Sequence, residues 1–83
     1  MKYRKKPVVI EAVQWLGTPE SMDAIRDLNI GGECVDFTHD NAFIVTLEGQ
    51  MNVDIGDWVI RGVKNELYPC KPDIFEMTYE RVE

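Results

Sequence analysis

A group of aromatic and basic residues lies near the C-terminus of this chain, at Trp58, Arg61, Lys64, Tyr68 and Lys71. Aromatic rings offer faces for stacking, and guanidinium and ammonium groups donate charge-assisted hydrogen bonds to phosphates or carboxylates. Three of the chain's nine basic residues gather here, although the protein carries a net charge of −6 at pH 7. The group therefore predicts a binding site for a small anionic ligand such as a nucleotide.

The same residues also have a structural interpretation. Alternate side chains of a strand point to opposite faces, so Trp58 would share one face with Ile60, while Arg61 would lie on the other. Trp58 would then belong to the core, and the neighbouring glycines and prolines would form turns and strand edges. Both interpretations stay open for the aromatic residues, whereas the grouping of the basic residues favours binding.

Short runs of β-branched and aromatic residues, separated by glycines, predict a set of strands. Residues 42–47 give the strongest pattern, and residues 51–55 alternate apolar and polar side chains, as a half-buried strand does. The other segments with strand character are 8–15, 33–37, 58–61, 66–70 and 78–82.

One helix is expected over residues 19–29. Thr18 is a suitable N-cap, and Pro19 fits the first helical position. Met22, Ile25 and Leu28 recur three residues apart and form an apolar stripe that would face the core. A proline followed by an aspartate predicts a second, short helical turn over residues 72–77.

These elements predict an α+β fold in a single domain that spans residues 1–83. Five to six short strands would form a small curled antiparallel sheet or partial barrel, packed against the one helix. A chain of this length has a modest core, and association with further copies of itself would add buried surface. We therefore expect a homo-oligomer.

The charge distribution limits the kinds of partner that the protein is expected to bind. Four basic residues lie within the first six positions, so the remainder of the chain carries a net charge of −10. Such an acidic body disfavours general binding to nucleic acids or to anionic membranes and suits a basic partner surface. The basic N-terminal run would either contact phosphates or discourage edge pairing of a strand, and the second role is favoured.

No apolar run is long enough for a membrane span or for a secretory signal, and we expect a cytoplasmic protein. Cys34 and Cys70 lack the spacing of metal ligands, and buried or half-buried free thiols are expected rather than a disulfide.

The sequence does not predict an enzyme. His39 is the chain's one histidine, and its neighbours Asp36, Asp40 and Asn41 are ordinary turn residues. A metal site there would need a further ligand from elsewhere. No phosphate-binding loop and no nucleophile motif occurs. We therefore expect no catalytic residue, no metal and no cofactor.

Long segments of the chain resemble a family of small phage and prophage proteins, most of which have no assigned activity. The resemblance rests on residues 2–15 (KYRKKPVVIEAVQW), 46–49 (TLEG), 56–63 (GDWVIRGV), 68–75 (YPCKPDIF) and 78–80 (TYE). The chain departs from the family pattern at Ile55, where proline is frequent, and at Asn65, where glycine is frequent. Both departures fall in turns.

The resemblance implies a phage accessory protein that acts inside a bacterial host cell. Small phage proteins of this kind often counter host defence, either by sequestering a nucleotide signal or by blocking a defence protein. The basic and aromatic group favours sequestration of a small anionic nucleotide. The alternatives are a protein inhibitor or adaptor that acts through its acidic surface, and a structural or morphogenetic phage component.

Overall fold

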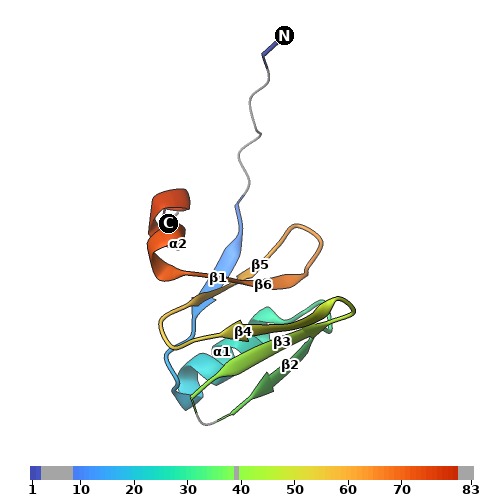
Figure 1. The fold of residues 1–83 in the computed structure, drawn as a ribbon, viewed down its shortest axis with the longest axis vertical. Coiled ribbons are helices and arrows are strands. Elements are labelled where there is room, and N and C mark those ends of the chain that lie inside the picture. The colour runs from blue at the N-terminus through green and yellow to red at the C-terminus, as the bar shows by residue number, and fades with distance from the viewer. Residues whose placement is uncertain (3–8, 39, 81–83) are drawn as a thin grey trace.

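Two small antiparallel sheets and two helices make up the part of the fold that the structure describes (Figure 1). The structure is a computed structural model that describes residues 1–2, 9–38 and 40–80. The strands are β1 (Glu11–Gln14), β2 (Cys34–Phe37), β3 (Ala42–Thr46), β4 (Gly49–Val53), β5 (Trp58–Arg61) and β6 (Leu67–Cys70). The helices are α1 (Pro19–Leu28) and α2 (Pro72–Thr78).

The first sheet has the strand order β1-β5-β6, and the second has the order β2-β3-β4. The N-terminal strand therefore pairs with the late β5–β6 hairpin, while α1 and the second sheet lie between them in the sequence. The prediction of an α+β domain is confirmed. Its strands form two separate sheets that do not close into a barrel.

The helix α1 begins with a capping box, in which two residues satisfy each other's backbone groups. The N–H of Ser21 donates to Oγ1 of Thr18 at 3.2 Å, and the N–H of Thr18 donates to Oγ of Ser21 at 3.2 Å. Ile25 and Leu28 of the predicted apolar stripe are buried. The sequence thus located both the start of this helix and the face that it buries.

The core lies between the two sheets and α1. Its buried members are Trp15, Ile25, Leu28, Ala42, Ile44, Val53, Val59 and Leu67. Trp15 directly follows β1 and is 1% exposed, and its indole N–H donates to the backbone carbonyl of Asp40 at 3.3 Å. This contact joins the first sheet to the β2–β3 connection.

Three local predictions were wrong. The first strand is shorter than expected, since β1 spans Glu11–Gln14 and the backbone of Trp15 continues beyond it with hydrogen bonds to Asp57 and Gly56; residue 8 lies outside the described residues. Residues 78–80 form no strand, since α2 extends to Thr78, and residues 81–82 lie outside the described part of the chain. Cys34 is exposed rather than buried, because the register places it beside Val45 on the outer face of the second sheet; both cysteines are free, as expected.

Asn65 is the one residue other than glycine with a positive φ in the part of the chain that the structure describes. It has a φ of 66° in the turn between β5 and β6. Glycine adopts this left-handed conformation freely, and asparagine is among the residues that tolerate it best. Asn65 is therefore compatible with this turn.

Candidate functional site

The five residues predicted to bind a ligand lie on the first sheet and at its connections. In the β5–β6 ladder Ile60 is opposite Tyr68, Trp58 is opposite Cys70 and Arg61 is opposite Leu67. Opposed residues share a face of the sheet. Trp58 and Tyr68 therefore point to one face and Arg61 to the other, so the structure separates the aromatic rings from the guanidinium group.

The helix α2 covers the aromatic face. Phe75 stacks on Trp58 with a centroid distance of 4.2 Å and an interplanar angle of 7°. Tyr79, the next residue after α2, lies 5.1 Å from Phe75 between ring centroids. Burial, together with a hydrogen bond to Tyr79, raises the pKa of the Tyr68 phenol to about 12. These rings are packed against one another, which supports the structural interpretation of Trp58.

Arg61 is held by contacts within the protein. Its Nη2 lies 2.9 Å from Oε2 of Glu11 on the adjacent strand, and its Nη1 donates to the carbonyl of Leu28 at 3.4 Å. The side chain of Arg61 is 18% exposed. The guanidinium group thereby joins β5 and β1 to the C-terminal end of α1, where carbonyl groups lack partners within the helix.

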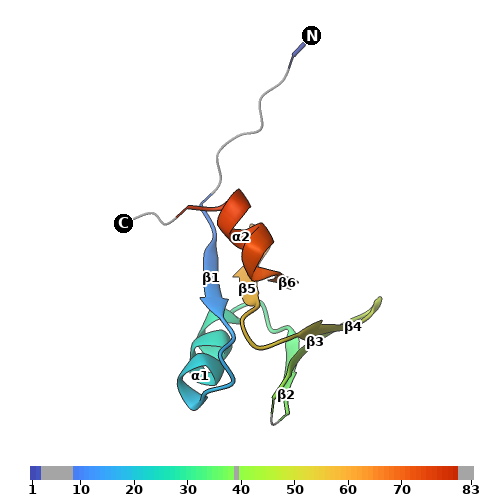
Figure 2. The ribbon, with the colours of Figure 1, turned by 60° about the vertical axis from the view of Figure 1, so that its left-hand side comes forward.

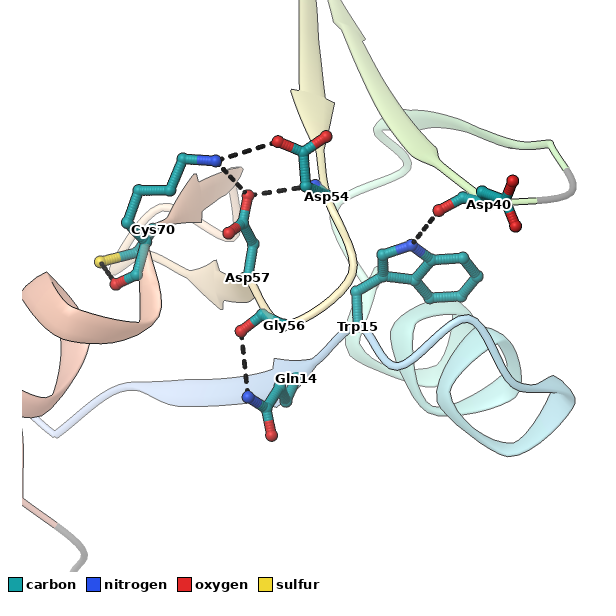
Figure 3. A network of polar contacts seen from close by, with 8 residues as sticks. Gln14, Trp15, Asp40, Asp54, Gly56, Asp57 and Cys70 are labelled. Atoms are coloured by element: carbon teal, nitrogen blue, oxygen red, sulfur yellow. Dashed lines mark hydrogen bonds and ion pairs between the residues drawn. The ribbon is translucent and has the colours of Figure 1, made fainter.

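Lys71 precedes α2 and contacts the connection between β4 and β5. Figure 3 shows the two carboxylates of this connection, Asp54 and Asp57, near each other. Its Nζ lies 2.9 Å from Oδ2 of Asp57 and 3.1 Å from Oδ2 of Asp54. Hydrogen bonds to these two carboxylates raise the pKa of the Lys71 amine. The side chain is still 56% exposed, so one side of it faces solvent.

Lys64 lies in the exposed turn between β5 and β6, and its backbone N–H donates to Oε2 of Glu66 at 3.0 Å. The five residues therefore do not converge on one pocket: two are paired with carboxylates, one is in a turn, and the two aromatic residues pack beneath α2. Tyr68 also lines a groove that the sequence did not predict.

This groove is open, has a volume of about 810 Å³, and runs between β6 and the β3–β4 hairpin. Its lining residues are Glu33, Val45, Thr46, Leu47, Glu48, Met51, Glu66, Leu67 and Tyr68. Three of the nine are glutamates and none is basic. The groove thus combines apolar surface with negative charge, and we call it the acidic groove.

The acidic groove arises because the β3–β4 hairpin projects beyond the first sheet. Figure 2 shows the hairpin reaching away from α1 and from β5 and β6. In the β3–β4 ladder, Met51 is opposite Ile44, so Met51 lies on the core-facing side of the second sheet. Met51 is closer to the hairpin tip than Val53, the last residue of β4. Leu47 at the tip is fully exposed. Side chains of a kind that is buried closer to the centre of the protein are therefore accessible along this edge.

A second, smaller hollow of about 430 Å³ lies between β1 and α1. Its charged lining residues are Glu11 and Asp27, and Glu11 is already paired with Arg61. Within residues 9–38 and 40–80, no three His, Cys, Asp or Glu side chains are grouped to hold a metal ion, and His39 lies outside these ranges. No helix in the described residues is long and apolar enough to cross a membrane.

Comparison with protein-family models, curated proteins and solved structures found no match to this chain. Sequence reasoning missed the acidic groove because its glutamates lie at positions 33, 48 and 66, each beside a turn, and become neighbours through the packing of two sheets.

Proposed function

We propose that this protein is a non-enzymatic binding protein that docks a positively charged partner protein in the acidic groove. The observation that carries the proposal is the composition of the groove, in which three glutamates lie beside the exposed Leu47 and the half-buried Met51, without a basic residue among the lining side chains that the structure describes. Apolar surface supplies binding energy when it is covered, and complementary charge supplies orientation and rate of association.

The charge of the whole chain supports the same proposal. A net charge of −6 attracts a cationic surface over several ångströms at moderate ionic strength, whereas phosphates are repelled. In the phage setting that the sequence resemblance implies, the partner is a protein of the bacterial host, and a defence protein is the leading candidate. An adaptor role towards a phage structural protein would use the same surface.

Sequestration of a small nucleotide stays a prediction. Two observations support it. Lys64 is exposed, and the side chain of Lys71 is 56% exposed although its amine is paired with carboxylates. Recruitment of Arg61 would require the ligand to displace Glu11, and recruitment of Lys71 would require it to compete with two aspartates. Calorimetry with cyclic and ADP-ribose-type nucleotides tests it, and saturable heat that Lys64→Ala lowers would support it.

The test of the proposed function compares two charge reversals of equal size. The groove variant is Glu33→Lys with Glu48→Lys, and the control is Asp23→Lys with Asp36→Lys, on α1 and on the outer face of β2. Immobilised protein captures partners from bacterial lysate at about 50 mM and about 500 mM salt, because exposed charges are screened over this range.

We expect a captured protein that the groove variant loses, the control retains, and high salt weakens. Equal loss in both variants would indicate dependence on net charge alone. Equal retention in both would show that the partner does not use the acidic groove.

A further inference from the structure

The second sheet gives the acidic groove a wall on which an apolar and an acidic side chain share one face. Met51 and Thr46 both lie on the core-facing side of this sheet, because Met51 is opposite Ile44 and alternate residues of a strand share a face. Glu33 directly precedes β2 and continues its register, which places it beside Thr46 on the same face. Strand spacings of about 4.8 Å and a rise of about 3.3 Å per residue put Met51 and Glu33 about 12 Å apart between Cα atoms.

The space between Met51 and Glu33 is open. Gly49 is opposite Thr46 in the β3–β4 ladder, and a Cβ at this position would meet no atom within 4 Å. Met51 and Glu33 are both half-buried, so each still presents surface to this space. A side chain from a partner can therefore enter here and touch both residues at once.

The carboxylate of Glu33 forms no hydrogen bond or ion pair with the residues that the structure describes. The contacts of Glu33 are made by its backbone: its N–H donates to Oδ1 of Asn29 at 2.9 Å, and its carbonyl accepts from Nδ2 of Asn29 at 2.7 Å. The ion pairs found in residues 1–2, 9–38 and 40–80 involve neither Glu33 nor Glu48. A half-buried carboxylate has lost part of its hydration, and a bound cation replaces the lost contacts.

We infer that the partner anchors itself in the acidic groove with one long basic side chain, a lysine or an arginine, whose methylene stem lies on Met51 and whose charged end is bound by Glu33. The inference rests on the proposed function and specifies which residue of the partner is recognised. Lysine and arginine bury their stems along apolar surface while the charged end stays in contact with water. Glu48 and Glu66 line the same groove and add to its negative potential.

Other side chains fit this wall less well. A wholly apolar side chain would cover Met51 but would remove water from the carboxylate of Glu33 without replacing it, which costs free energy. A short cation would pair with Glu33 and leave Met51 exposed. An acidic side chain or a phosphate would meet repulsion from the glutamates. Arginine is also among the residues on which binding energy concentrates at protein interfaces.

The test is an NMR titration of the ¹⁵N-labelled protein with capped pentapeptides of glycine and serine that differ only at the central residue. Peptides with central lysine or arginine should give saturable shifts at residues 33, 46–48 and 51. Norleucine keeps a stem and has no charge, whereas diaminopropionate keeps the charge on a short stem. Each of these two peptides should bind about tenfold more weakly than the lysine peptide, because each retains one of the two contacts.

Three single substitutions assign the two contacts. Met51→Gln should weaken binding of the lysine peptide and leave the diaminopropionate peptide unaffected, and Glu33→Gln should weaken the lysine peptide and leave the norleucine peptide unaffected. Glu33→Gln keeps the backbone bonds to Asn29, so its fold is retained. Asp36→Asn removes an equal charge from the outer face of β2 and is the control, which should leave every affinity unchanged.

The outcomes separate this inference from the proposed function. Equal affinity for the lysine and diaminopropionate peptides would overturn the contact with Met51, while the acidic groove remained a docking site for positive charge. Spermidine that binds as tightly as the lysine peptide would identify a free polyamine as the occupant and would overturn the inference. Absence of binding by both the lysine and the arginine peptide would overturn it as well. The proposed function fails in addition only if the Glu33→Lys, Glu48→Lys variant retains the protein captured from lysate.

Discussion

The amine of Lys71 lies 2.9 Å from Oδ2 of Asp57, an aspartate whose side chain is 5% exposed. The same oxygen accepts the backbone N–H of Asp54 at 3.0 Å. Asp57 therefore fixes the turn that follows β4 and also holds the residue from which α2 begins. Lys71, which the sequence predicts to contact a ligand, is thus already paired with a carboxylate of the protein itself.

Removal of the Asp57 carboxylate should destabilise the protein. Asp57→Ala leaves the N–H of Asp54 and the amine of Lys71 without this acceptor, and we expect a loss of about 1–3 kcal/mol in the free energy of unfolding. Urea denaturation followed by circular dichroism measures the loss. Asp54→Ala is the matched control, since its side chain is 61% exposed and exposed ion pairs contribute about 0–1 kcal/mol. Equal effects of the two substitutions would contradict the special role of Asp57.

Stability should fall at alkaline pH. The pKa values of Lys71 and of Tyr68, the latter about 12, are raised in the folded protein, so the native state holds these protons more tightly than the unfolded chain does. Such groups contribute their full stabilisation below the unfolded pKa, and the contribution is lost as the pH rises through the folded pKa. For Tyr68 this window extends from its ordinary value of 10.0 to about 12.

Denaturation curves across this window check the prediction. Tyr68→Phe cannot ionise at this position, so its stability should depend less steeply on pH above 10 than that of the unsubstituted protein. An unchanged pH dependence in Tyr68→Phe would contradict the assignment of the raised pKa to this phenol.

Local sequence signals predicted the elements that local interactions decide. Thr18, Pro19 and the stripe at Ile25 and Leu28 gave α1 almost to the residue, because capping and the helical period act within a few positions. The alternation in residues 51–55 likewise reported a strand, although the ladder shifts it to Gly49–Val53.

The surroundings of the predicted site residues depend on tertiary packing and were not predictable in this way. The stacking of Phe75 on Trp58 and the pairing of Lys71 with Asp57 join residues separated by 17 and 14 positions. Short-range sequence patterns identified side chains that are able to stack or to form ion pairs. They did not identify the residues that contact these side chains in the folded protein. The acidic groove is a similar case, since it forms where two sheets leave an edge uncovered.

The stacking of Phe75 on Trp58 should anchor α2 to the first sheet. Phe75→Ala removes the stacked ring, and we expect a loss of about 1–2 kcal/mol, since aromatic pairs contribute about 0.5–1.5 kcal/mol beyond the area that they bury. Trp58 should become more hydrated, with a red shift of its fluorescence, while Trp15 remains buried in the core. Met77→Ala on the exposed side of α2 is the control and should leave both readouts unchanged, since Met77 is 86% exposed. A red shift in the control, or its absence in Phe75→Ala, would contradict this anchoring role.

The conformation of Asn65 should decide how this turn responds to substitution. With a φ of 66°, Asn65→Gly should be tolerated within a few tenths of a kcal/mol, whereas Asn65→Val should cost about 1–2 kcal/mol, because side chains branched at Cβ are strained in the left-handed region. Thermal unfolding of the two variants provides the comparison. Equal stability of the two variants would contradict the role of the left-handed conformation of Asn65 in this turn.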